Sequence, residues 1–314
     1  MLTRRHIRIK VMQSVYSFSF KKNHNLEDEV NFFKDSVAQT FDLYLLLLGL
    51  FRSISHYVDE QIDLYHQHNM LADERYSKFK KLAHNPALRF FHNHPTLEKN
   101  IQRKKFIRWD LEFKFLKELL DSLFESDFFL EYLRINEPTE QNHIQCLVVL
   151  FKQKIAPSPY VYGHVEDKGL TWTDDLPLVN TFLLKMLKNI KTNDLQSLQF
   201  PMPIENREDM DFGVHLLEQV IAKEDELQKE LNGKTPNWDE ERIAHLDNII
   251  LKTAIAELLF FPNIPVKVTL NEYLEIAKDY STPNSNHFVN GVLDKLVREF
   301  QEEKRLNKTG RGLL

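Results

Sequence analysis

The chain has 314 residues, of which 42% are hydrophobic and 28% are charged, and its formal net charge is −5. This is an ordinary globular balance, sufficient for one large or two modest domains. One cysteine, Cys146, excludes a disulfide scaffold and any all-cysteine metal site.

The longest apolar run, residues 43–51, is far shorter than the ~20 residues that span a bilayer. The N-terminus has charge but no apolar signal core. We therefore expect a cytoplasmic protein with no membrane segment. A nucleic-acid binder with this net charge must gather its positive residues into one patch.

Residues 1–22 predict a basic N-terminal helix whose core face carries Ile7, Val11 and Val15. Lys10, Ser14 and Ser17 should occupy the opposite side. Positive charge in the first turn of a helix opposes the helix dipole and so destabilises the helix. The arginines there are therefore better explained by binding to a polyanion than by a role in folding. A solvated basic terminus is the alternative. The segment has no acidic residue and six basic ones, which are Arg4, Arg5, Arg8, Lys10, Lys21 and Lys22.

Residues 23–204 form an aromatic-rich middle part that we expect to be mostly helical, with apolar periodicity over 28–66, 110–134, 139–154 and 176–190. Within it, the run Arg103–Trp109 mixes basic and aromatic side chains, a combination that could extend a nucleic-acid-binding surface. The interpretation we favour is a solvated start of a helix with Trp109 in the core.

Residues 205–305 predict a compact helical module, followed by a basic tail over 306–314. A helix over 208–231 should end at Gly233 in a left-handed turn, and a short helix should cover 239–246. The next stretch, 247–261, is apolar nearly all round, which is typical of a central buried helix.

The sequence of this module predicts two further helix starts. Thr269 and Glu272 have capping-box spacing, and Thr282 precedes a proline suited to a first helical turn. The mid-helix Gly291 predicts the close approach of another backbone, because glycine costs about 1 kcal/mol there against alanine.

Signals of catalysis are missing from the sequence. It has no GxGxxG, P-loop or GxSxG pattern. The pairs His66/His68 and His92/His94 lack the i, i+4 spacing of a helical metal site. Cys146 lies in an apolar run, where a thiol is most often inert. We expect no enzyme activity, no cofactor and no metal.

The C-terminal motifs are similar to those of the NusB family of bacterial transcription antitermination factors. The resemblance is carried by Ile264–Val268, Asn271-Glu272 and Phe288–Lys295. It extends to Arg5–Arg8 and Gln13–Tyr16, which resemble the family's opening helix. It covers about 1–22 and 205–305, and the long insertion between them resembles the Bacteroidota members.

The resemblance implies an all-α fold, in which a NusB-like helical bundle carries a large helical insertion after its first helix. It also implies binding to the single-stranded boxA element of ribosomal RNA operon transcripts, together with the small-subunit ribosomal protein NusE and the transcription elongation complex. The RNA-binding residues would be Arg4, Arg5, Arg8, Gln13, Tyr16, Phe288 and Asn290. The partner-binding residues would be Asp247, Asn284 and His287.

These roles require that the opening helix and the helix beginning near Phe288 share one face of the molecule. Two other interpretations stay open. One is a protein-interaction scaffold of NusB-like fold without RNA binding. The other, less favoured because the middle part is Gly-poor, is an RNA-methyltransferase-associated NusB-like protein.

Overall fold

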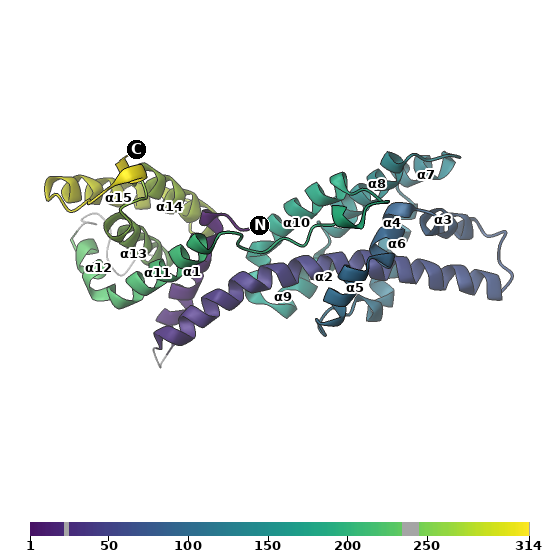
Figure 1. Cartoon of the computed structure of the whole chain (residues 1–314), viewed down its shortest axis with the longest axis horizontal. Coiled ribbons are helices and arrows are strands. Elements are labelled where there is room, and N and C mark those ends of the chain that lie inside the picture. Colours follow the sequence, from purple (N-terminus) through teal and green to yellow (C-terminus); the bar gives the residue numbers. More distant parts are fainter. Residues whose placement is uncertain (22–24, 234–244, 314) are drawn as a thin grey trace. The chain divides into compact units, whose positions relative to one another are not determined.

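The computed structural model describes residues 1–21, 25–233 and 245–313. These residues form helices and turns, with one isolated bridge between Lys191 and Asp194 and no strand (Figure 1). The prediction of an all-α fold is confirmed. The chain divides into two compact units. Unit 1 comprises Met1 and Ala38–Pro203, and unit 2 comprises Leu2–Val37 and Ile204–Leu314.

Helix α2, Leu26–Gln67, contributes to both units. By length and composition it could cross a membrane, but 67% of its most apolar stretch is buried in the structure. Its part in unit 1 supplies Leu43–Leu48 and Phe51 to a large apolar core. The apolar character of α2 is therefore that of a core helix.

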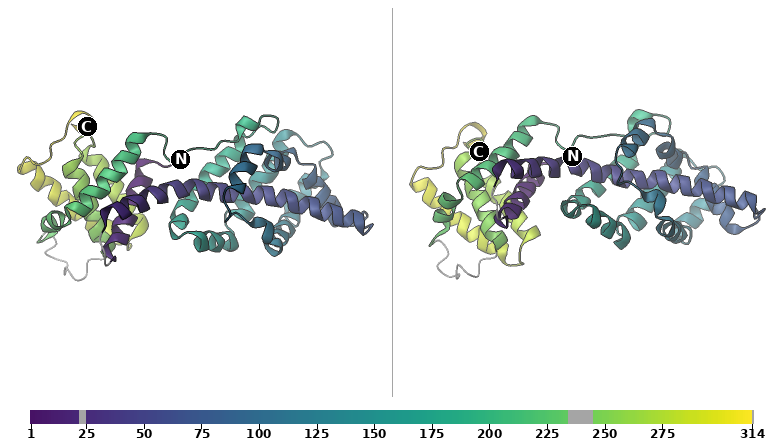
Figure 2. Two further views of the ribbon diagram at one scale, coloured as in Figure 1. Left: turned by 60° about the horizontal axis from the view of Figure 1, so that its bottom comes forward. Right: turned by 90° about the horizontal axis from the view of Figure 1, so that it is seen from below.

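Unit 1 surrounds its part of α2 with shorter helices, which flank it in both views of Figure 2. The predicted helix 110–134 is interrupted, because Ser126 caps a new helix by accepting a hydrogen bond from Phe129 N–H. The elements are α3 (Glu74–Ala83), α4 (Pro86–Asn93), α5 (Pro95–Gln102), η1 (Trp109–Leu111), α6 (Phe113–Phe124), α7 (Asp127–Arg134), α8 (Glu140–Val149), the π-helix η2 (Leu150–Ile155), α9 (Pro159–Lys168), α10 (Leu170–Asn189) and η3 (Leu195–Ser197).

Unit 2 is built around α13, which packs against α1, α11, α12, α14 and α15. The predicted central helix is confirmed, since α13 is buried on nearly every side. The core also takes Val30, Phe33 and Val37 from α2, which the sequence had assigned to the insertion. The elements are α1 (Arg4–Ser19), α11 (Arg207–Ala222), α12 (Glu224–Leu231), α13 (His245–Phe260), α14 (Val266–Tyr280), α15 (Ser285–Glu302) and η5 (Gly310–Leu313).

Several local predictions in unit 2 need correction. Lys10 and Ser14 are buried rather than exposed, because α1 packs against both α11 and α13. The predicted helix 208–231 is divided at Lys223, while Gly233 does adopt the left-handed conformation, with φ +71°. Lys22 and most of the predicted helix 239–246 lie outside the described residues.

The predicted capping box at Thr269 is wrong. Helix α14 begins three residues earlier, at Val266, so Thr269 is inside the helix and its hydroxyl donates to the buried carboxylate of Glu257 at 2.8 Å. Helix α15 likewise begins at Ser285, with Asn284 rather than Thr282 in the capping position.

The prediction that another backbone approaches closely at Gly291 is also wrong. A Cβ on Gly291 would meet nothing within 4 Å. The close approach is at Gly213 of α11, where a Cβ would lie 2.4 Å from Phe33 Cζ and 2.7 Å from Ile7 Cγ2. Glycine at 213 therefore allows α11 to lie directly against α1 and α2.

Candidate nucleic-acid interface

The N-terminal end of α1 holds its exposed arginines close to acidic side chains. Arg4 Nε lies 2.7 Å from Asp209 Oδ1 on α11, and Arg5 donates two hydrogen bonds to Glu272 of α14, at 2.8 and 3.1 Å. The hydrogen bond from Arg5 lowers the pKa of Glu272, although burial opposes this shift. Both arginines remain partly accessible, but neither is an unpaired cation.

Arg8 does not lie on the surface. Its side chain is 2% exposed, and its Nε and Nη2 donate to the two carboxylate oxygens of Glu257 at 2.7 and 2.8 Å. Burial alone would lower the pKa of the Arg8 guanidinium, but the hydrogen bonds and charge of Glu257 outweigh it and raise that pKa. The sequence-based role of Arg8 in binding phosphate is therefore not available in this conformation.

The carboxylate of Glu257 is the centre of a wider buried network. Besides Arg8, it accepts hydrogen bonds from the hydroxyls of Thr269 and Tyr273. Burial raises the pKa of Tyr273 well above its ordinary value, so this hydroxyl stays protonated and donates. The network joins α1, α13 and α14 and thereby fixes the direction in which α1 presents its exposed side chains.

The C-terminal end of α1 carries exposed rings. Tyr16 is 42% exposed and Phe20 is 66% exposed, and their ring centroids are 5.0 Å apart. His245, the first residue of α13, lies 5.6 Å from Tyr16 and 5.2 Å from Phe20, and its Nε2 is 2.8 Å from Ser19 Oγ. The i, i+4 spacing of Tyr16 and Phe20 on α1 could have identified this pair from the sequence, whereas His245 joins the two rings only through the packing of α13 on α1.

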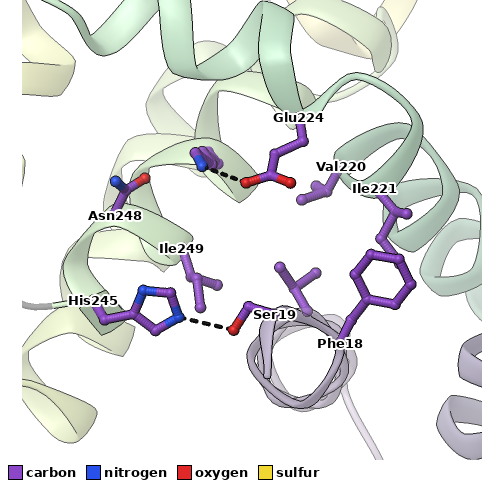
Figure 3. A pocket seen from close by; sticks show the side chains of 10 residues that line it. Phe18, Ser19, Val220, Ile221, Glu224, His245, Asn248 and Ile249 are labelled. Atoms are coloured by element: carbon purple, nitrogen blue, oxygen red, sulfur yellow. Dashed lines mark hydrogen bonds and ion pairs between the residues drawn. The ribbon is translucent and has the colours of Figure 1, made fainter. Parts of the chain in front are cut away.

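A cavity of about 360 Å³, lined in part by His245, lies between α1, α11, α12 and α13 (Figure 3). His245 points toward Ser19 along one side of it, and Glu224 lies across from them. Apolar and polar side chains share its wall. The lining residues are Val15, Phe18, Ser19, Val220, Ile221, Glu224, His245, Asn248, Ile249 and Lys252.

The predicted partner-binding residues meet at the start of α15. Asp247 of α13 is buried and accepts a hydrogen bond from Ser285 Oγ at 2.7 Å. Asn284 and His287 are exposed on either side of Ser285. Asp247 therefore holds the start of α15 in place from within, while the two other residues face outward.

The remaining predicted RNA contacts are only partly accessible. Phe288 is buried, and Gln13 is half-buried on α1. Asn290 is half-buried, and its side-chain amide donates to Asp294 at 3.1 Å along the same helix. The predicted site is thus less continuous than the sequence suggested.

Helix α1 separates its arginines from its rings. Arg5 and Tyr16 are 11 positions apart, which corresponds to about 16 Å along an α-helix. Both α1 and α15 pack against α13, so the opening and closing helices belong to one bundle. The exposed features of α1 nevertheless form two clusters, one at each end.

Two of the four basic side chains in the run Arg103–Trp109 are paired with carboxylates. Trp109 is fully buried, with its indole N–H donating to Leu46 O at 2.8 Å, as the favoured interpretation predicted. Lys104 pairs with Asp42, and Arg108 pairs with Asp110. Among the described residues, no group of three or more His, Cys, Asp or Glu side chains could hold a metal ion.

Comparisons with known proteins identify the family of this chain. A family model described as the NusB family matches residues 181–298. The transcription antitermination protein NusB of Desulforudis audaxviator is 38% identical over 97 residues, which are 31% of this chain and 70% of that protein. The chain belongs to the NusB family.

Other NusB proteins match in the same way. That of Salinibacter ruber is 43% identical over 104 residues, or 33% of this chain and 65% of that protein. That of Chloroherpeton thalassium is 38% identical over 104 residues, or 33% of this chain and 49% of that protein. The chain thus spans less than two thirds of the length of each of these two NusB relatives. Helix α1 lies outside the residues that the NusB family model matches, and no solved structure matches the chain.

Proposed function

We propose that this protein is a cytoplasmic transcription antitermination factor that acts by binding and catalyses no reaction. The observation that carries the proposal is the match of residues 181–298 to the NusB family. The matching curated relatives are named transcription antitermination proteins. The matched residues include α11, α13 and α14, which form the wall against which α1 packs or pairs.

The proposed RNA ligand is the single-stranded boxA-type element of ribosomal RNA operon transcripts. Arg4 and Arg5 would meet its phosphates, and Tyr16 would stack on an unpaired base. Their partial exposure on one helix supports these roles. Arg8 would act indirectly, by holding α1 against α13 through Glu257.

The proposed protein partner is the ribosomal protein NusE, within the transcription elongation complex. Its surface would include the exposed Asn284 and His287 at the start of α15. Asp247 would position them through its hydrogen bond with Ser285. This assignment extends the resemblance of the 264–296 motifs to the NusB family.

One observation favours the alternative of a scaffold without RNA binding. Asp209 and Glu272 already neutralise Arg4 and Arg5, which weakens the attraction for phosphate. The methyltransferase alternative has less support. A dinucleotide-type cofactor domain needs a strand before its Gly-rich turn, and residues 1–21, 25–233 and 245–313 contain no such strand.

A binding titration tests the proposal. The full chain is titrated with boxA-type RNA and with a scrambled RNA of equal length, with and without NusE, at two salt concentrations. Preferential binding of boxA-type RNA, strengthened by NusE, is the expected result. Equal affinity for both RNAs under every condition would leave only general polyanion binding, and no binding would favour the scaffold.

A further inference from the structure

We propose that Tyr16, Phe20 and His245 form a stacking platform for unpaired bases, and that the adjoining cavity receives one of those bases. The inference rests on the proposed RNA-binding function. It adds two residues, Phe20 and His245, and a base pocket to that function.

The three rings form a compact group drawn from two helices that are distant in sequence. Their centroids are separated by 5.0, 5.2 and 5.6 Å, and their planes are inclined to one another by 57–68°. Such inclined rings leave faces open, and every nucleobase can stack on an open aromatic face.

The three rings are exposed at positions where they contribute little to the stability of the fold. Phe20 occupies the position after the last residue of α1, where a polar residue would be equally compatible with ending the helix. Scattered exposed apolar residues are common, but a cluster from separate elements marks an interaction surface. The hydrogen bond between Ser19 and His245 holds the ring of His245 in place before any ligand arrives.

The cavity beside the rings has the character of a site for a flat, polar-edged ring. Its volume of about 360 Å³ lies within the range of roughly 300–1,000 Å³ found for ligand pockets. Val15, Val220 and Ile249 supply apolar wall. Ser19, His245 and Asn248 line the same cavity, so its wall offers polar groups to the edge of a base.

The charges around the cavity are compatible with RNA. Glu224, the acidic side chain among the lining residues, is neutralised by Lys252 at 2.9 Å. Lys21 follows Phe20 directly and remains partly exposed while paired with Glu29. A stacked strand would therefore not bring its phosphates against an unpaired carboxylate of the lining.

The test measures the affinity of the full chain for boxA-type RNA at several salt concentrations. Phe20→Ala and His245→Ala should each weaken binding about fivefold to a hundredfold, while Phe20→Trp keeps affinity close to the unsubstituted level. In Phe20→Ala the slope of affinity against salt should stay unchanged, because the phenylalanine side chain carries no charge. Phe113→Ala, an exposed aromatic in unit 1, is the matched control and should bind normally.

A second readout uses RNA carrying the fluorescent base 2-aminopurine, whose emission falls on stacking. Quenching that is lost in Phe20→Ala but kept in Phe113→Ala supports the platform. Unchanged affinity and quenching in Phe20→Ala and His245→Ala would overturn it while RNA binding itself stands. Loss of NusE association with RNA affinity intact would also overturn it, in favour of a protein contact. If the unsubstituted chain binds no boxA-type RNA, the proposed function fails first.

Discussion

Arg8 and Glu257 form a two-point ion pair inside unit 2, with the guanidinium donating to both carboxylate oxygens at 2.7 and 2.8 Å. The pair links α1 to the central helix α13. It also explains how an arginine is accommodated in the first half of α1, since its charge is compensated by another helix rather than by a bound anion.

Removing one member of this pair should strongly destabilise unit 2. Arg8→Ala leaves the Glu257 carboxylate buried without its cation, and such a change typically costs about 3–5 kcal/mol of unfolding free energy. Amide hydrogen exchange of α13 peptides measures the loss. Arg4→Ala, which breaks the more exposed pair with Asp209, serves as the control and should cost less than about 1 kcal/mol. Similar exchange in both variants would contradict the structural role of Arg8.

Two glycines should respond to alanine in opposite directions. Gly213→Ala places a methyl group against Phe33 and Ile7 and should destabilise the protein by about 1–3 kcal/mol. Gly291→Ala has open space and sits inside α15, so it should stabilise by about 0.5–1 kcal/mol. Thermal unfolding of both variants measures the two effects. A lower melting temperature for Gly291→Ala would contradict the open space beside Gly291.

Glu272 should restrain Arg5 and so limit the affinity for RNA. In Glu272→Gln the competing negative charge is gone, and Arg5 becomes available to a phosphate. We expect several-fold tighter binding of boxA-type RNA and a salt slope steeper by up to one phosphate contact, about 0.7. Glu275→Gln is the matched control, because Glu275 lies 3.9 Å from Arg5 and should matter less. Equal effects of the two substitutions would count against the restraint.

The same pair should make the protein less stable in acid. Because Arg5 lowers the pKa of Glu272 in the folded state, the pair's contribution is fully present above the unfolded pKa and is lost as the pH falls through the folded pKa. Below about pH 4.5, the melting temperature should therefore fall more steeply for the unsubstituted protein than for Glu272→Gln. Parallel curves would show that this pair contributes nothing to acid sensitivity.

Cys146 should be unreactive in the folded protein. It is fully buried in unit 1, and burial raises the pKa of its thiol to about 12, so the reactive thiolate is scarce near neutral pH. Ellman's reagent should react with the single cysteine only as unit 1 unfolds in urea. Rapid labelling without denaturant would mean that α8 opens readily.

The sequence predicted the helical class and the central position of α13, because both depend on local periodicity. It also placed Cys146 and Trp109 in the core, where both are buried. It could not predict that Arg8 meets Glu257, 249 positions away, since the local spacing of residues in α1 carries no information about a partner on α13. Thr269 was misread for the same reason: its spacing to Glu272 fits a cap, but each side chain has a stronger partner on another helix.

The candidate site shows the same limit. Tyr16 and Phe20 are four positions apart on α1 and could be paired from the sequence, whereas His245 joins them only after α13 packs on α1. Gly291 drew attention because it interrupts a helix, yet the glycine that matters for packing is Gly213, whose neighbours come from α1 and α2. Long-range packing therefore decides which of the conspicuous residues are functional candidates.

The most direct test of the account is a map of where boxA-type RNA touches the chain. RNA containing 4-thiouridine is bound to the full protein, cross-linked by light, digested and analysed by mass spectrometry. We expect cross-links within residues 4–20 and at the start of α13, both in unit 2. Cross-links confined to unit 1, residues 38–203, would contradict it.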